Sequence, residues 1–200
     1  MELDHLAVAG KTLEEASAHV EQALGVAMQP GGQHARFGTH NMLLGLGDGL
    51  YLEAIAIDPK APSPGRMRWF DLDHLDGPPH LRCWICRVPD LDAALMTAPP
   101  GCGDPIELER GDLKWKMAVP DTGILPYDNV FPALIQWRGD LHPANMLADS
   151  GCRLRSLTVS HPDVEPLRGD LEGIALVRVE RGEPGLVAEI ETPHGVRVLE

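Results

Sequence analysis

The chain has 200 residues, of which 44% are hydrophobic and 24% are charged, a balance typical of a globular protein with a sizeable core. Its formal net charge is −13, and such an acidic surface repels phosphate groups, so we expect neither nucleic acid nor an anionic membrane as a partner. No apolar run approaches the length of a membrane span, and the acidic N-terminus is unlike a signal peptide, so we expect a cytoplasmic protein.

The first predicted unit covers residues 1–57 and has the element order βαβββ. A strand over 3–9 precedes Thr12-Leu13-Glu14-Glu15, in which Thr12 and Glu15 fit a capping box at the start of a helix. Gly25 has the position of a residue that ends this helix. Three extended segments are then predicted, separated by glycines: 33–37, 40–46 and 49–57.

The same order returns in a second unit, over residues 81–138, after a Pro-rich linker over 58–80. A strand is predicted over 81–88, and Asp90 is the expected N-cap of a short helix. The remaining extended segments are 105–109, 113–118 and 131–138. Cys83 and Cys86 lie three residues apart on the strand, so their side chains point to opposite faces and cannot share a metal.

A linker over 139–152 leads to a shorter third unit over 153–200, which also has a βαβββ-like order. Asp163 is the expected cap of its helix, and we expect the unit to extend or cap the sheet. Its predicted strands are 154–160, 174–180, 185–191 and 195–199. Repetition of one unit at this scale predicts an α+β fold built from tandem copies.

Tandem βαβββ units resemble the vicinal oxygen chelate superfamily, which includes lactoylglutathione lyase, extradiol dioxygenases and bleomycin-resistance proteins. Four short segments resemble its glyoxalase-like branch most closely: Leu3-Asp4-His5-Leu6, Gly38-Thr39-His40-Asn41, Tyr51-Leu52-Glu53 and Val88-Pro89-Asp90-Leu91. The resemblance implies that the paired units curl into a funnel-shaped mixed sheet, with the helices outside and a ligand or metal inside.

The resemblance also implies an inward-facing functional side chain on the first and last strand of each unit. His5 fits the first position and Glu53 fits the second. The alternation of side chains along a strand supports both, because His5 shares a face with Ala7 and Ala9 while Leu6 and Val8 take the other. A carboxylate such as Glu53 is costly to bury in an apolar row unless it is paired, protonated or bound to metal.

The second unit supplies weaker candidates. His5 lies seven residues before Thr12, and counting back seven from Asp90 gives Cys83 rather than His80. On the last strand Gln136 is the best counterpart of Glu53, and Trp137 replaces it if the register slips by one. His5, Glu53, Cys83 and Gln136 together make a poor site for a hard metal. We therefore expect no resident metal, and a divalent metal on His5 and Glu53 stays open as the alternative.

Three further residues are candidates for ligand binding. The resemblance suggests Asn41 as a polar group of the pocket, although an asparagine in a turn also serves local backbone chemistry. Trp69, in the Pro-rich linker, either plugs the sheet or covers a ligand. Trp115 shares a face with Leu113 and Met117 on an amphipathic strand, for which core packing is the default.

The main functional hypothesis is an isomerase or lyase that binds a small organic molecule. Glu53 would act as the general base, with His5 and Gln136 polarising an oxygen of the substrate. One alternative is a non-catalytic protein that binds or sequesters a small molecule, and another is a metal-dependent lyase or dioxygenase. A funnel filled by Trp69 and Trp115 would instead favour a scaffold, and a homodimer is an open arrangement.

Overall fold

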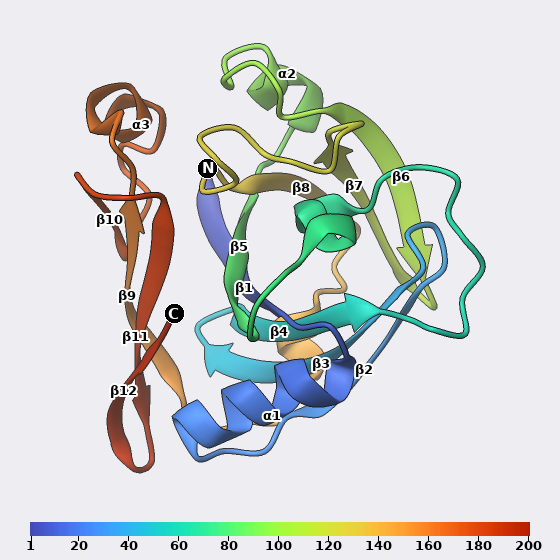
Figure 1. Cartoon of the computed structure of the whole chain (residues 1–200), viewed down its shortest axis with the longest axis vertical. Helices are drawn as coiled ribbons and strands as arrows, with labels where there is room; N and C mark the ends of the chain where they lie inside the picture. The colour runs from blue at the N-terminus through green and yellow to red at the C-terminus, as the bar shows by residue number, and fades with distance from the viewer.

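The computed structural model describes the whole chain, residues 1–200, and places its first two units in one eight-stranded sheet (Figure 1). The strands are β1 (Glu2–Ala9), β2 (Gln29–His34), β3 (Thr39–Gly47), β4 (Leu50–Ile57), β5 (His80–Arg87), β6 (Asp104–Arg110), β7 (Leu113–Val119) and β8 (Ala133–Arg138). Their order across the sheet is β2-β3-β4-β1-β5-β8-β7-β6, and the sheet curls into a half-barrel.

The two units are joined through their first strands. β1 pairs in parallel with β4 and antiparallel with β5, and β5 in turn pairs in parallel with β8. Each unit therefore places its last strand beside its first, so the two halves of the sheet repeat one pattern. This confirms the predicted α+β fold of tandem βαβββ units around a curled mixed sheet.

The helices lie outside the curve, as predicted. α1 (Leu13–Leu24) begins with the capping box formed by Thr12 and Glu15 and ends at Gly25, whose φ of 71° is left-handed. α2 (Leu91–Leu95) has Asp90 as its N-cap, whose side chain accepts from the amide of Ala93. None of the chain's helices combines the length and the apolar character that crossing a bilayer requires.

Alternate residues of the central strands supply two separate cores. Leu6 and Val8 pack outside the curve in a cluster that includes residues of α1, whereas Ala7 and Ala9 belong to a cluster inside it. The same division separates Cys86, outside, from Cys83, inside. The predicted faces of these strands are confirmed, and the small inner residues of β1 leave room above the middle of the sheet.

β2 differs from its predicted position, since it runs over Gln29–His34 instead of 33–37. Pro30, Gly31 and Gly32 are typical of a turn in the sequence, but here they belong to an edge strand with a register shift between Pro30 and Gln33. An edge strand tolerates proline and a bulge because one side of its backbone has no partner strand. The predicted strand residues after His34 instead form the turn that ends at Gly38, whose φ is 60°.

The Pro-rich linker over 58–80 crosses the concave side of the sheet and carries a 3-10 turn, η1 (Trp69–His74), which Figure 1 shows within the curve. Phe70 and Asp71 have positive φ angles of 59° and 55°. Arg82 of β5 holds this backbone, because its guanidinium donates to the carbonyl of Phe70 and to the Asp71 carboxylate. The linker is thus a fixed part of the concave side.

The third unit forms a sheet of its own. Its elements are β9 (Arg153–Ser160), α3 (Val164–Asp170), β10 (Val177–Glu180), β11 (Gly185–Thr192) and β12 (Gly195–Leu199). The strand order β10-β9-β11-β12 departs from that of the first two units, since β9 pairs with β10 and β11 and not with the last strand. The unit therefore does not extend the half-barrel.

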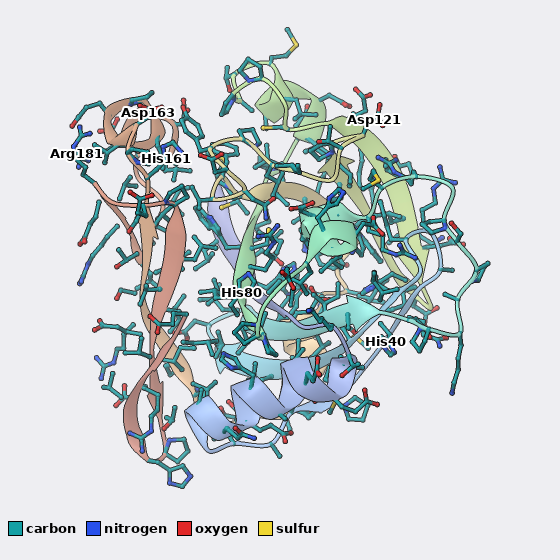
Figure 2. All side chains as sticks on the ribbon, in the orientation of Figure 1. His40, His80, Asp121, His161, Asp163 and Arg181 are labelled. Carbon is teal, nitrogen blue, oxygen red and sulfur yellow. The ribbon has the colours of Figure 1, made fainter.

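This second sheet covers the convex side of the first, where Leu157 and Ile190 join the outer core (Figure 1). At its far end, His161 accepts from the amide of Asp163 and Arg181 donates to the carbonyl of Pro162. Figure 2 shows His161, Asp163 and Arg181 gathered beside α3. The third unit thus adds buried surface on the side that faces away from the concave hollow.

Candidate functional site

A small cavity of about 40 Å³, partly open to solvent, lies on the concave side of the eight-stranded sheet. Its polar lining comes mainly from the first unit: His5, His34, Asn41, Tyr51 and Glu53, with Arg110 from β6. Its apolar lining comes mainly from the second: Trp115, Met117, Ile135 and Trp137. Trp69 and Phe70 of the linker form part of the wall, so the linker helps to enclose the cavity.

Glu53 lies at the centre of the polar side and is 5% exposed. Its Oε1 accepts a hydrogen bond from Nδ2 of Asn41, whereas Oε2 has no hydrogen bond and lies 3.9 Å from Nε2 of His5. The orientation of the Asn41 amide is set by its neighbours, because the amide of Gly32 donates to Oδ1 at 2.7 Å. One carboxylate oxygen is therefore fixed and the other is free to meet a ligand.

His5 reaches the cavity together with Asp4 because β1 has a bulge. The pairing of β1 with β5 shifts between Leu3 and His5, and this irregularity lets two successive side chains serve the same side of the sheet. The Nδ1 of His5 lies 2.6 Å from Oδ1 of Asp4. An Nδ1–H donated to Asp4 leaves Nε2, the nitrogen nearest Glu53, free of a proton in the neutral ring.

Asp4 is fully buried and serves as the acceptor for three rings. Besides His5, Nε1 of Trp137 and Nε2 of His142 each lie 3.0 Å from its Oδ2. Burial by itself would raise the pKa of Asp4, but the hydrogen bonds from His142 and His5 outweigh it and hold the pKa well below the usual range. Asp4 therefore remains a carboxylate that orients the His5 ring.

A second polar group closes the gap between the two edge strands β2 and β6. Arg110, at the end of β6, donates through one nitrogen, Nη1, to Oδ1 of Asn41 and to Nε2 of His34, each at 3.3 Å. The Nδ1 of His34 lies 3.1 Å from the hydroxyl of Thr39. Burial, and then the charge of Arg110, lowers the pKa of His34 to about 3, so this ring is neutral near pH 7.

Tryptophan side chains line this cavity and limit its size. Trp69 stacks on Phe37, with ring centroids 4.1 Å apart, and Trp115 lies 5.6 Å from Trp137. Both predicted tryptophans therefore lie at the cavity, where their faces form walls. Tyr51 stacks on His5 at 4.3 Å, and burial raises the pKa of its hydroxyl well above the ordinary value. Both tryptophans are also buried in the inner core, so the space that remains beside them is small.

The placement predicted for Gln136 is wrong. Gln136 lies on the outer face of β8, where its side chain accepts from the amide of Leu91 and donates to the carbonyl of Pro89. It therefore satisfies backbone groups at the start of α2. The alternation along β8 places Ile135 and Trp137 in the cavity instead, which is the register slipped by one residue.

Cys83 lies under the cavity floor in the inner core, with no exposed surface, and is not among the lining residues. Burial raises the pKa of its thiol to about 12, so a thiolate paired with His5 is not supported at neutral pH. Cys83, the second-unit counterpart of His5, is therefore a packing residue, and Gln136 likewise does not contribute to the cavity.

All four cysteines are free and buried, and burial raises the pKa of each thiol. We expect the native protein to react with a thiol reagent such as dithionitrobenzoate at pH 8 only as fast as it unfolds, because thiolates are the reacting species. Absorbance in the presence and absence of urea measures this. Rapid release of one equivalent from the native protein would contradict the buried position of these side chains.

The metal that the resemblance implied does not fit these residues. His5 and Glu53 are two suitable ligands, but the second unit offers only Cys83, which is buried and protonated, and the cavity-facing Ile135 and Trp137 of β8, which cannot ligate. No three side chains of His, Cys, Asp or Glu are grouped so that they could hold a metal ion. His80 does not add a ligand, since its Nδ1 is directed to the carbonyl of Pro78.

The structure brings together His5, Asn41, Glu53, Trp69 and Trp115 at one cavity, and leaves out Cys83 and Gln136. Sequence reasoning missed three polar residues of the site: Asp4, His34 and Arg110. Asp4 was missed because strict alternation places it on the opposite face from His5, whereas the bulge in β1 brings both to the same side. Arg110 and His34 lie at strand ends that looked like turns, but the two glycines beside His34 were an available signal of a close approach.

Comparison with known proteins places the chain among proteins of the same architecture. A family model described as a glyoxalase-like domain matches residues 3–174. A hypothetical protein from Staphylococcus aureus has a similar structure, with a TM-score of 0.62 and 13% identity, covering 92% of this chain and 87% of that one. Methylmalonyl-CoA epimerase from Mycobacterium tuberculosis has a TM-score of 0.43 and 17% identity, covering 70% and 88%. No curated protein matches the sequence.

Proposed function

The chain belongs to the glyoxalase-like domain family, and from this premise we propose that it binds a small organic molecule in the cavity and catalyses a proton transfer on it. The reaction class is that of an isomerase or lyase, with Glu53 as the general base. The observation that carries the proposal is the state of the Glu53 carboxylate: one oxygen is fixed by Asn41, and the other is unbonded at the cavity beside His5.

This geometry suits the removal of a proton from carbon. A general base needs to be held in place while one lone pair faces the substrate. The hydrogen bond from Asn41 holds Glu53 in place through Oε1. The mostly apolar walls from the second unit exclude water from a bound molecule, which strengthens electrostatic interactions with the carboxylate. The proton leaves the substrate carbon for Oε2 of Glu53, and the electron pair of the broken C–H bond moves toward an adjacent carbonyl.

His5 completes the proposed pair of proton-transfer groups. Its Nε2 lies 3.9 Å from Oε2 of Glu53, so a substrate atom near one group is near the other. Asp4 holds the opposite nitrogen, Nδ1, and stabilises the imidazolium that forms when Nε2 accepts a proton. Neutral His5 can accept a proton and imidazolium can return one, as an isomerase needs.

Exchange of hydrogen for deuterium tests this function on any compound with an acidic C–H bond, so the natural substrate need not be identified first. The protein is incubated in D₂O with a panel of small ketones, keto acids, hydroxy acids and thioesters, and incorporation of deuterium at carbon is followed by proton NMR. We expect at least one compound to exchange, and Glu53→Gln to slow its exchange by about 100-fold or more, because a general base contributes on this scale.

Glu172→Gln is the matched control, because Glu172 is exposed beyond α3 and distant from the cavity. It removes the same charge and is expected to leave exchange unchanged. Equal exchange by wild type and Glu53→Gln would contradict the role of Glu53. Binding of a compound of the panel without any exchange would favour a protein that binds or sequesters a small molecule.

A further inference from the structure

Arg110 is the charged residue of the cavity that the proposed proton transfer does not use. Its side chain lies on the same face of β6 as that of Leu108, an inner-core residue two positions earlier, and therefore points to the concave side. From β6 it reaches across to the first unit, where Asn41 and His34 accept from Nη1. Arg110 thus lies at the cavity without belonging to the Glu53 and His5 pair.

The positive charge of Arg110 has no acidic partner. Arginines of the neighbouring linker each have one, since Arg66 pairs with Asp121 and Arg68 with Asp73, but no carboxylate lies within ion-pair distance of Arg110. Both of its contacts are to neutral acceptors, because Asn41 is uncharged and burial keeps His34 neutral. Arg110 is half-buried, and an unpaired guanidinium in that setting is unusual in a chain whose net charge is −13.

We infer that Arg110 binds a carboxylate of the substrate, so that the substrate class is a small organic acid. This inference rests on the proposed function of the cavity and specifies the chemical class of its substrate. Both contacts of Arg110 use Nη1, which leaves the N–H groups of Nε and Nη2 for an incoming anion. Two such groups match the two oxygens of a carboxylate in the paired geometry that arginine favours.

The position of Asn41 sets the distance between the anchor and the base. Its Oδ1 accepts from Arg110 and its Nδ2 donates to Glu53, so a single amide group separates the guanidinium from the catalytic carboxylate. A carboxylate bound at Arg110 therefore brings a carbon one or two bonds away to Oε2 of Glu53. The expected reacting hydrogen lies on the carbon next to the bound carboxylate or on the following one.

Two glycines of β2 make this arrangement sterically allowed. A Cβ at Gly32 would lie 2.7 Å from Cδ of Arg110, and a Cβ at Gly31 would lie 2.0 Å from Oδ1 of Asn41. Both contacts are closer than a real Cβ permits, so any other residue there displaces the side chains that form the anchor. Gly32 thus offers a way to move Arg110 without removing its charge.

The test measures binding of malonate and of its neutral counterpart malonamide by saturation-transfer NMR. We expect wild type to bind malonate and Arg110→Gln to bind it at least about tenfold more weakly, because even one of the two charge-assisted hydrogen bonds contributes on this scale. Malonamide binding is expected to be weak in both. Arg138→Gln is the matched control, since Arg138 pairs with Glu107 at the surface, and it is expected to bind malonate like wild type.

Gly32→Ala provides a second variant that keeps the guanidinium, and Gly169→Ala, where no atom lies within 4 Å of the new Cβ, is its control. We expect Gly32→Ala to weaken malonate binding and Gly169→Ala to leave it unchanged, with circular dichroism confirming the fold of each. Malonate binding that is absent from wild type, equal in Arg110→Gln, or equal to that of malonamide would overturn the inference.

The deuterium experiment separates this inference from the proposed function. If Arg110→Gln exchanges a carboxylate-bearing compound as well as wild type does while Glu53→Gln does not, the anchor is wrong and the function stands. If malonate binding depends on Arg110 but no compound exchanges, the anchor stands and the proton transfer is wrong. Glu53→Gln itself is expected to bind malonate at least as tightly as wild type, because it removes a nearby negative charge.

Discussion

Asp4→Ala is expected to lower the free energy of unfolding by about 3 kcal/mol, the scale of breaking a buried charged hydrogen-bond network. The substitution leaves three ring donors, on His5, Trp137 and His142, without their acceptor in a buried site. Exchange activity should fall with stability, because the His5 ring loses the partner that sets its orientation. Urea unfolding followed by tryptophan fluorescence measures the first effect, and the deuterium assay measures the second.

Asp149→Ala is the control for this prediction, because Asp149 is an exposed residue in an ion pair with Arg153. Its removal should cost only a few tenths of a kcal/mol, as for other surface pairs. The effect of Asp4 should also depend on pH. Its folded pKa is lowered, so its contribution is present above pH ~4, the unfolded value, and is lost at lower pH. A loss equal to that of Asp149→Ala would refute the network.

Wild type is expected to lose stability as the pH falls below about 6.5, where the unfolded chain protonates His34 and the native state does not. Burial, and then Arg110, lowers the folded pKa of His34 to about 3, so between these values the unfolded state binds more protons. Each pH unit in this interval then costs about 1.4 kcal/mol from this group. Urea unfolding at pH 7, 6, 5 and 4.5 measures the slope.

His34→Gln isolates the contribution, because glutamine keeps an acceptor for Arg110 but does not titrate. The variant is expected to be less stable than wild type at pH 7, through lost packing, yet to show a shallower decline on acidification. The curves of the two proteins should converge as the pH approaches 4.5. Parallel curves would mean that His34 becomes protonated in the native state and that the Arg110 contact is not maintained.

The sequence predicted the repeated units and the faces of the central strands, because those features depend on local patterns. The capping box of Thr12 and Glu15 located α1, and alternation along β1 and β4 placed His5 and Glu53 toward one hollow. Alternation fails where a strand is irregular, so Asp4 was missed at the bulge. A similar irregularity occurs in β2, where Pro30 and two glycines indicated a turn, so His34 was not recognised as a residue that faces the cavity.

Other parts of the site depend on contacts between distant residues. Gln136 was a reasonable counterpart of Glu53 by position, but its parity on β8 is fixed by pairing with β5 and β7, which no local pattern records. Arg110 comes from a strand end and His142 from a linker, so only the folded chain shows that Arg110 reaches the cavity and that His142 contacts Asp4. The third unit has the same order of elements along the chain as the other two, so the sequence alone did not show that its strands pair differently and form a separate sheet.

The two units that build the half-barrel repeat a backbone pattern but not a set of side chains. Carboxylate, imidazole and amide groups come from one half, whereas indole, thioether and aliphatic surfaces come from the other. A molecule held between them meets unlike partners on its two sides and cannot be turned end for end without losing its contacts. If the carbon deprotonated by Glu53 is stereogenic, the cavity should therefore distinguish mirror images, with the hydrogen of one enantiomer presented to the base and that of the other directed at the wall.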